Sequence, residues 1–303
     1  MKKRLNLFHS IINKSKNLNI NTDLSLEQTI SYFNAQNAEA LKVMSFNMKR
    51  NYFSFGQNSW KNRVELIANL IDLQQPDVVG TQELTAKNLN DLTKLLPNYD
   101  VVGQGRGGDD KGEYTAIFYR KDKFKLKDQE TFWLSATPNK PSRAWFALCP
   151  RICTTCTLEL QGNTKRFIRI FNTHLDHLSF LSRKNSLQLI SSKMQEKNLQ
   201  QEASVLLMGD FNAKPKSKTI KAWYQDLSTK TNNALQNAYL QCDYSDIGRS
   251  FHGFKGKIKG MPIDYIFASS SLDLQRVSLC RDSINNRYPS DHYPVLAQYM
   301  LSC

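Results

Sequence analysis

The chain has 303 residues, of which 40% are apolar, so it can form one large α/β domain or two ordinary ones. No stretch approaches the roughly 20 uninterrupted apolar residues of a membrane span, and residues 1–20 are too rich in Asn and Lys for a secretory signal. A soluble protein is expected, with the cytoplasm as its default location, although unconventional export would leave no signal in the sequence.

The formal net charge of +14 favours a polyanionic partner, either nucleic acid or a phosphorylated surface. Lys and Asn are abundant along the whole chain, which offers compositional drift as the alternative explanation for part of this charge. The charge does not exclude an acidic metal pocket, and nothing in the sequence indicates a stable protein partner.

Residues 1–38 are expected to form an N-terminal appendage to a main domain of residues 39–303. The segment Ser25-Leu26-Glu27-Gln28 fits a capping box, and Leu26, Ile30 and Phe33 recur at helical spacing. A short amphipathic helix that packs on the main domain is predicted here. A basic anchor on a membrane surface is the alternative.

From Leu41 onward, apolar runs alternate with helical patterns. The sequence predicts strands at residues 41–47, 77–83, 114–119, 151–160, 166–172, 205–212, 261–268 and 295–299. It predicts helices at residues 60–73, 84–96 and 182–199, a Gly-rich loop at 103–112, a basic hairpin tip at 121–127 and a loop through Pro150. No internal repeat or linker interrupts this pattern, which favours one domain of two packed sheets covered by helices.

The six cysteines could be read as a zinc site because Cys149, Cys153 and Cys156 are closely spaced. However, residues 151–160 are rich in β-formers, and no second ligand pair follows at zinc-finger spacing. Buried or half-buried strand thiols are therefore predicted instead, and scattered thiols suit a reducing compartment.

Several predicted strands end on polar residues that can bind metals or transfer protons. The clearest is Val205 to Asn212, an apolar run that ends with Asp210 and Asn212 on one face. An Asx turn that closes a core strand would explain this pair equally well if it stood alone. The same pattern recurs at Asn47, Glu83, His174, Asp264 and His292, and this repetition favours a site at one rim of the sheets.

The residue types narrow the chemistry. Asn, Glu and Asp supply the hard oxygen ligands that Mg²⁺ and Mn²⁺ prefer, while histidines remain for proton transfer. The sequence has no nucleophile elbow, Walker sequence or His-Glu-x-x-His motif. Metal-assisted hydrolysis of a phosphate ester fits this set best.

The ordered motifs resemble the endonuclease/exonuclease/phosphatase (DNase I-like) superfamily over about residues 41–302. They are Ser45-Phe46-Asn47, Gln82-Glu83, Asn172-Thr173-His174-Leu175-Asp176, Gly209-Asp210-Phe211-Asn212, Ile263-Asp264-Tyr265 and Ser290-Asp291-His292. Residues 132–135, 172–177 and 288–295 are most similar to a bacterial-type branch whose substrate is not settled. The resemblance implies a four-layer α/β/β/α sandwich with the site at the shared edge of two mixed sheets.

The resemblance also implies roles for individual residues. Asn47, Glu83 and Asp291 would be metal ligands, with Asp291 at an alternative or second metal position. Asp210 would orient or activate the attacking water, and Asn212 would contact the scissile phosphate. His174 would contact phosphate and assist the leaving oxygen, and Tyr114 would contact phosphate. His292, oriented by Asp264, would bind the phosphoryl group or transfer a proton. The implied mechanism is metal-assisted, in-line attack by water, with Mg²⁺ as the cofactor and Mn²⁺ as a substitute.

The substrate is the least determined feature. A nuclease acting on DNA or RNA is the first expectation, because residues 251–259 mix Phe251 and Phe254 with three lysines; an ordinary hairpin with a solvated basic tip is the alternative. The second expectation is a phosphatase or phospholipase acting on inositol phosphates, phosphoinositides or sphingolipids, with an anionic membrane as partner. No long apolar insertion supports the sphingolipid substrate. A catalytically silent binding module is disfavoured because every expected polar position is filled.

Overall fold

The structure is a computed structural model that describes residues 40–50, 56–162, 165–230, 235–242 and 244–301. The predicted appendage of residues 1–38 lies outside the described residues. Within the described residues, no helix is both long and apolar enough to cross a membrane.

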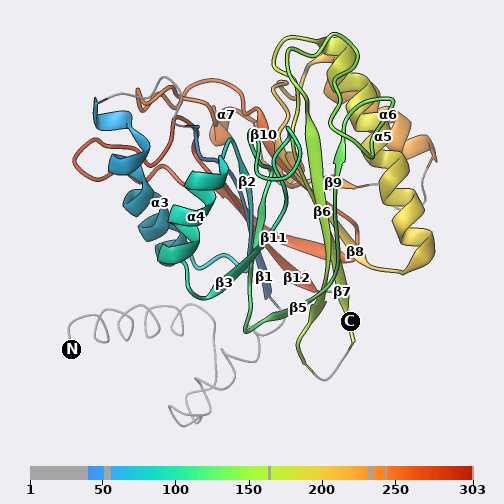
Figure 1. Cartoon of the computed structure of the whole chain (residues 1–303), viewed down its shortest axis with the longest axis horizontal. Coiled ribbons are helices and arrows are strands. Elements are labelled where there is room, and N and C mark those ends of the chain that lie inside the picture. The colour runs from blue at the N-terminus through green and yellow to red at the C-terminus, as the bar shows by residue number, and fades with distance from the viewer. Residues whose placement is uncertain (1–39, 51–55, 163–164, 231–234, 243, 302–303) are drawn as a thin grey trace. The chain divides into compact units, whose positions relative to one another are not determined.

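Two six-stranded mixed sheets form the centre of the main domain (Figure 1). In the first, the strand order is β11-β12-β1-β2-β4-β3, formed by Leu272–Leu279, Val295–Leu301, Ala40–Asn47, Val78–Gln82, Ile117–Arg120 and Tyr99–Val102. In the second, it is β5-β6-β7-β8-β10-β9, formed by Phe124–Trp133, Ile152–Leu160, Phe167–His174, Ser204–Asp210, Asp264–Ala268 and Gln236–Asn237.

Four helices cover the outer faces of the sheets, which completes the predicted four-layer sandwich. Helices α3 (Trp60–Gln74) and α4 (Ala86–Leu95) pack on the first sheet, and α5 (Phe180–Gln200) and α6 (Lys218–Lys230) pack on the second. Shorter helical segments are η1 (Gly56–Asn58), η2 (Ala238–Gln241) and α7 (Tyr244–Ile247). The fold class expected from the sequence is therefore confirmed.

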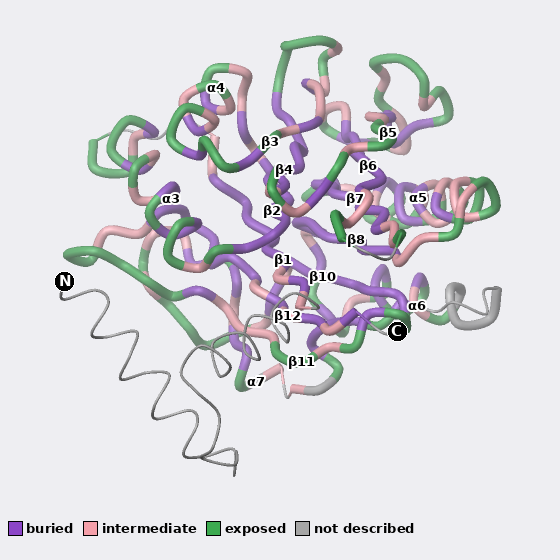
Figure 2. Tube along the Cα trace, turned by 90° about the horizontal axis from the view of Figure 1, so that it is seen from below, coloured by how far each residue is buried: buried purple, intermediate pink, exposed green. Residues whose placement is uncertain are grey.

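The apolar core has two parts. One joins both sheets with α5 and α6, and the other joins the first sheet with α3 and α4. Figure 2 shows the strands as mostly buried, whereas the exposed residues gather on loops and outer helix faces. The strand residues Cys153 and Cys156 are buried in the first core, as expected for strand thiols. Burial raises the pKa of both thiols, which suits a packing role.

The prediction of a basic hairpin tip at Lys121 to Lys127 is wrong. Strand β5 begins at Phe124, and it pairs with β6 of the second sheet and not with the preceding strand β4. The chain therefore crosses between the sheets at this point. The reason is that the alternating lysines Lys125 and Lys127 lie on an exposed edge strand, and in the sequence they resemble a solvated turn. Strands β3, β9 and β11 were also not predicted, and all three lie at sheet edges.

Candidate active site

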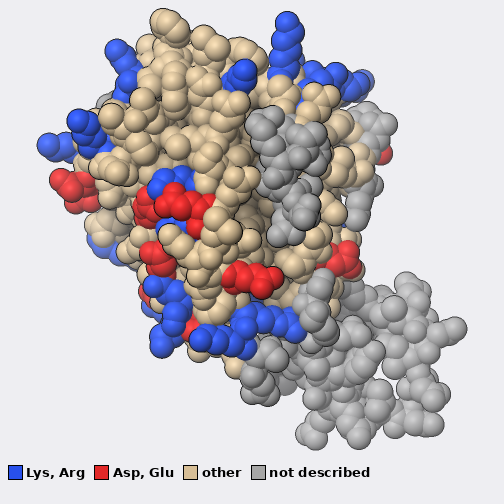
Figure 3. All heavy atoms as spheres, turned by 90° about the vertical axis from the view of Figure 1, so that its right-hand side faces the viewer, with Lys and Arg blue, Asp and Glu red and all other residues tan. Residues whose placement is uncertain are grey.

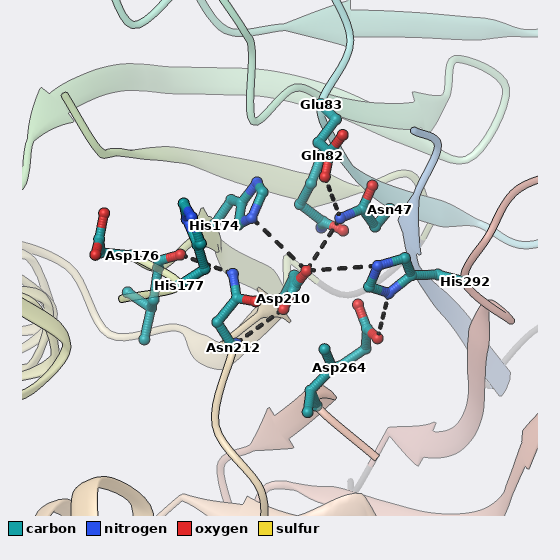
Figure 4. A network of polar contacts seen from close by, with 12 residues as sticks. Asn47, Gln82, Glu83, His174, Asp176, His177, Asp210, Asn212, Asp264 and His292 are labelled. Carbon is teal, nitrogen blue, oxygen red and sulfur yellow. Dashed lines mark hydrogen bonds and ion pairs between the residues drawn. The ribbon is translucent and has the colours of Figure 1, made fainter. Parts of the chain in front are cut away.

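The register of the strands brings the predicted polar residues to one edge of the two sheets. Strands β1 and β2 are parallel, and Asn47 at the end of β1 lies beside the end of β2, directly before Glu83. Strands β7 and β8 are also parallel and end together at His174 and Asp210. Asp264 begins β10, but because β10 runs antiparallel to β8 it lies beside Asp210. Residues far apart in the sequence thus share one site (Figure 4).

A glycine permits this arrangement at the end of β8. Gly209 has a φ of 143°, and a Cβ atom at this position would lie 1.9 Å from the carbonyl oxygen of Thr173 on β7. A side chain would therefore collide with the neighbouring strand just before Asp210. The close approach of β7 and β8 fixes the backbone that carries the Asp210 carboxylate.

Asn47 connects the carboxylates of the two sheets. Its Nδ2 atom donates hydrogen bonds of 3.0 Å to Glu83 Oε1 and 3.0 Å to Asp210 Oδ2. Glu83 has a φ of 67°, which is unusual for a residue other than glycine, and its Oε2 accepts a 3.0 Å hydrogen bond from the backbone amide of Arg50. The strained backbone and these donors hold the Glu83 carboxylate facing Asp210 across the sheet edge.

His292 and Asp264 form a buried pair. His292 Nδ1 lies 2.8 Å from Asp264 Oδ2, and both side chains are buried. Burial disfavours the charged imidazole, but Asp264 and the other nearby carboxylates outweigh it and raise the pKa of His292 to about 10. At neutral pH, His292 is therefore an imidazolium whose ring is held by Asp264.

Two imidazoles lie on opposite sides of Asp210 (Figure 4). The Asp210 Oδ2 atom is 3.7 Å from His174 Nε2 and 3.8 Å from His292 Nε2. Burial, together with the nearby Asp264 carboxylate, raises the pKa of Asp210 to about 7. Burial and the charge of Arg151 hold the pKa of His174 well below its usual range, so His174 is neutral. The site thus contains one carboxylate near its titration midpoint between a neutral and a charged imidazole.

Asp291, the third predicted metal ligand, is paired with a lysine. Its Oδ2 atom forms a 3.2 Å ion pair with Lys49 Nζ. Lys49 also acts on Glu83: burial disfavours the Glu83 charge, but the neighbouring His174, this lysine and the hydrogen bonds from Arg50 N and Asn47 outweigh burial and lower the pKa of Glu83. Lys49 therefore connects the two acidic positions electrostatically, and the role of Asp291 as a metal ligand stays a prediction.

The structure brings the other two predicted site residues close to this edge. The backbone amide of Asn212 donates to Asp210 Oδ1 at 2.8 Å, and its side-chain amide donates to the carbonyl of Leu175 at 3.0 Å. Tyr114 is buried, and its hydroxyl donates to Asp110 Oδ1 at 2.6 Å. A phosphate contact from Asn212 or Tyr114 remains a prediction, because both side chains already have partners in the protein.

The donor set fits a divalent cation. Glu83 and Asp210 supply hard carboxylate oxygens, the ligand type that Mg²⁺ prefers. Asn47 would contribute its side-chain oxygen, because the Nδ2 atom that donates to both carboxylates cannot bind a cation. Asp210, Asp264 and His292 also place possible ligand atoms within 4.8 Å of one another, but the His292 imidazolium would have to lose a proton to bind a metal. Asp264 Oδ1 is buried without a hydrogen-bond partner in the described part of the chain. From the sequence, Asp210, Asp264 and His292 are expected to act in catalysis, with the metal bound by other residues; the closeness of these three side chains is seen only in the structure.

Sequence reasoning missed two buried supports of the site. Gln82 Nε2 donates to Asn172 Oδ1 at 2.8 Å, and Asn172 Nδ2 donates to the carbonyls of Thr81 and Ala116 at 2.9 Å each, which ties the two sheets together. Both residues lie inside the motifs that carry the family resemblance, and only their inward position on a strand could have revealed this role.

Arg63 is the second support. This buried guanidinium on α3 donates to the carbonyls of Met48 and Lys49 at 2.8 Å each and to the carbonyl of Pro289 at 2.7 Å. It therefore clamps the segment after Asn47 to the segment before His292. Ser290 adds a second link, because its hydroxyl donates to the carbonyl of Asn47 at 2.6 Å. An arginine within an amphipathic helix gave no sign of this role.

The model of the endonuclease/exonuclease/phosphatase family matches residues 44–292, which contain every site residue described above. The chain belongs to this family. Its members are phosphoester hydrolases, and the chain is an enzyme of that class.

Relatives with different names are similar to this chain. A solved mannosyl-6-phosphatase from Bacteroides thetaiotaomicron is 32% identical, with a TM-score of 0.76 over 86% of this chain and 100% of its own. An uncharacterised protein of Acanthamoeba polyphaga mimivirus is 28% identical over 84% of this chain and 98% of its own. Human tyrosyl-DNA phosphodiesterase 2 is 26% identical over 54% of this chain and 40% of its own. These relatives include both a phosphatase and a phosphodiesterase.

Proposed function

We propose that the protein is a Mg²⁺-dependent phosphodiesterase that uses water as the nucleophile, with Mn²⁺ as a substitute metal. The observation that carries this proposal is the placement of Asp210, which is bound to Asn47 and flanked by His174 and His292 at the edge of both sheets. Glu83 and Asn47, with Asp210 beside them, would hold the metal. When bound, the metal would offset negative charge on the phosphoryl oxygens.

Each group then has a defined task. Asp210, with its pKa near 7, can orient a water molecule and accept its proton at neutral pH. His292, held as an imidazolium by Asp264, can bind a phosphoryl oxygen or donate a proton to the leaving oxygen. His174 is neutral and can donate a hydrogen bond to phosphate from one ring nitrogen. The reaction proceeds by direct displacement, without a covalent enzyme intermediate.

Nucleic acid is the first candidate substrate class, and the net charge of +14 is compatible with it. Phe251 supports it, because its exposed ring has its centroid 5.0 Å from that of His292 and could stack on a base at the site. Lys255, Lys257 and Lys259 are exposed on the same segment. Phe254, by contrast, packs against the guanidinium of Arg63 at 5.5 Å, so only one of the two expected aromatic residues faces outward.

The phosphate group of a lipid is the second candidate substrate. A basic protein is attracted to an anionic membrane as well as to nucleic acid, so charge alone does not distinguish the two. The specific observation in favour of lipid is a set of exposed apolar side chains on the segments that follow His174 and precede Arg151. These side chains would contact the apolar part of a bilayer, which a nuclease does not require.

A substrate panel tests the proposed function. Hydrolysis of bis-(p-nitrophenyl) phosphate, single- and double-stranded DNA, RNA, phosphoinositides, sphingomyelin and mannose 6-phosphate would be measured with Mg²⁺, and with EDTA before and after added Mg²⁺ or Mn²⁺. We expect EDTA to abolish the activity and either metal to restore it. Hydrolysis that is unaffected by EDTA would contradict the proposed metal dependence, and hydrolysis of the phosphomonoesters alone would contradict the diester assignment.

A further inference from the structure

Two segments beside the active site expose an unusual number of large apolar side chains. The exposed fractions are 87% for Phe146, 57% for Leu148, 65% for Leu178, 40% for Phe180 and 47% for Leu181. We call these five residues the apolar rim. Single exposed apolar residues are normal on a protein surface, but several in neighbouring segments indicate an interaction site.

Partly buried hydrogen bonds hold the two segments of the rim together. The fully buried carboxylate of Asp176 accepts from the backbone amides of Leu148, at 3.2 Å, and of Leu178, at 3.0 Å. The Ser179 hydroxyl donates to the carbonyl of Trp145 at 2.7 Å. Figure 1 shows the loop between β5 and β6 beside the first turn of α5. The rim is thus one surface whose two halves are tied by the hydrogen bonds of Asp176 and Ser179.

The backbone of the rim is strained in a way that exposes an aromatic side chain. Trp145 and Phe146 have consecutive φ values of 54° and 60°, and bulky residues rarely adopt this left-handed conformation. Such strain costs about 1–3 kcal/mol per residue, and burial of the Phe146 ring does not compensate for it. The strained backbone and the exposed ring together favour a binding role for Phe146.

The charges around the rim are mostly positive. Residues 137–151 and 177–195, which include both segments, contain no Asp or Glu, while Lys140, Arg143 and Lys184 are exposed there. Figure 3 shows Lys and Arg along the upper edge of the side that carries α5 and α6, whereas acidic and basic side chains are mixed lower down. Acidic residues approach the rim at one end, because the Gly-rich loop with Asp109 and Asp110 borders Pro141.

The rim adjoins the catalytic residues. Asp176, which ties its halves together, is two residues after His174, and its carboxylate lies 3.5 Å from the Nε atom of Arg151. Leu175, between His174 and Asp176, accepts the side-chain hydrogen bond of Asn212. A surface that rested on the rim would therefore present its phosphate groups beside the active site.

We propose that the apolar rim docks the enzyme on an anionic phospholipid bilayer, so that the proposed phosphodiesterase site acts on lipid phosphate. Leu148, Leu178 and Leu181 have no aromatic face with which to stack on bases, but they can enter the boundary between headgroups and acyl chains. The neighbouring cations would attract anionic headgroups. The combination of aliphatic, aromatic and cationic side chains favours a bilayer over nucleic acid.

Co-sedimentation of the full chain with vesicles tests the proposal. Vesicles of phosphatidylcholine with phosphatidylserine would be compared with phosphatidylcholine alone, for the wild type and for a Phe146→Ser, Leu148→Ser, Leu181→Ser variant. We expect binding to the anionic vesicles and an affinity at least about tenfold weaker in the variant. The matched control, Leu73→Ser, Leu199→Ser, Leu240→Ser, removes three leucines that are exposed elsewhere and is expected to bind normally.

Three results would overturn the proposal. The wild-type chain could fail to bind anionic vesicles, or the rim variant could bind them as well as the control variant does. The rim variant could also lose oligonucleotide binding while it keeps vesicle binding. Both variants retain residues 1–39. If those residues caused the vesicle binding, the rim variant would bind as strongly as the control variant, which is the second of these results. If the triple variant fails to fold, Phe146→Ser alone provides the same comparison.

Activity measurements distinguish a failure of this docking proposal from a failure of the proposed function. Vesicle binding would also be measured with Asp210→Asn, because docking does not require catalysis. Hydrolysis of the soluble bis-(p-nitrophenyl) phosphate is expected to be unchanged in the rim variant. Loss of vesicle binding with retained soluble activity supports the rim as a docking surface. Absence of metal-dependent hydrolysis in the wild type contradicts only the proposed function.

Discussion

Asn47 and Asp210 are 163 positions apart in the sequence, yet the Asn47 Nδ2 atom lies 3.0 Å from Asp210 Oδ2. This hydrogen bond crosses from the first sheet to the second, and the same amide nitrogen also binds Glu83. The position of the proposed water-activating carboxylate is therefore set by a side chain from the other half of the domain.

Replacement of Asn47 by Ala tests this relationship. The change removes the donor that orients both carboxylates, and we expect kcat/KM for bis-(p-nitrophenyl) phosphate to fall about 10–100-fold. The midpoint of urea unfolding should change little compared with the loss of activity. Wild-type turnover in the Asn47→Ala variant would show that this contact does not organise the site.

Arg63 provides a test of the clamp between the two site segments. Arg63→Met leaves the carbonyls of Met48, Lys49 and Pro289 buried without this donor, and we expect the free energy of unfolding to fall by about 3 kcal/mol. Urea denaturation followed by circular dichroism measures it. Lys61→Met, an exposed position on the same helix, is the control and should be close to neutral. Equal stability of the two variants would argue against the clamp.

Gly209 tests the backbone that presents Asp210. In Gly209→Ala, the new methyl group would collide with the Thr173 carbonyl at a φ that disfavours side chains, and we expect a loss of at least about 2 kcal/mol. Thermal unfolding would be compared with Gly162→Ala, where a Cβ meets no atom within 4 Å. A Gly209→Ala protein as stable as the Gly162→Ala control would be inconsistent with the close approach of β7 and β8.

His252 predicts a dependence of stability on pH. Burial lowers the pKa of this histidine to about 4, whereas an unfolded histidine has a pKa of about 6.5. Between these values the unfolded chain binds a proton that the folded chain does not, so stability is full above pH 6.5 and falls as the pH drops towards 4.

The matched variant His252→Asn isolates this contribution. Its Oδ1 atom can replace His252 Nδ1 as the acceptor for the Gly256 amide, but it does not titrate. Urea unfolding at pH 7.5 and pH 5 should show a smaller loss of stability in the variant than in the wild type. The same loss in both proteins would mean that His252 does not contribute.

Much of the site could be predicted from sequence because each polar residue follows an apolar run. Asp210 after Val205 to Met208 and Asn47 after Val43 to Phe46 are local signals, and the family motifs placed them in one site. The register that pairs His174 with Asp210 was not visible, since it depends on long-range strand pairing.

The residues that support the site were hidden for a different reason. Arg63 looks like a solvated helix residue until the fold places the carbonyls of Met48, Lys49 and Pro289 around it. Asn172 looks like a strand end until the packing of the two sheets brings Gln82 to it. The apolar rim could not be predicted, because apolar residues such as Phe146 and Leu148 are usually buried. Only the structure shows that these two are exposed. Edge strand β5 was mistaken for a turn because its lysines face solvent.

The most direct test of the central claim is the Mg²⁺-dependent hydrolysis of bis-(p-nitrophenyl) phosphate by Asp210→Asn, which keeps the shape of the side chain but removes its charge. We predict a fall in kcat of at least about 100-fold, with cooperative unfolding retained. His292→Ala should also lose activity. Full turnover by Asp210→Asn would contradict the assignment of this carboxylate as the group that activates water.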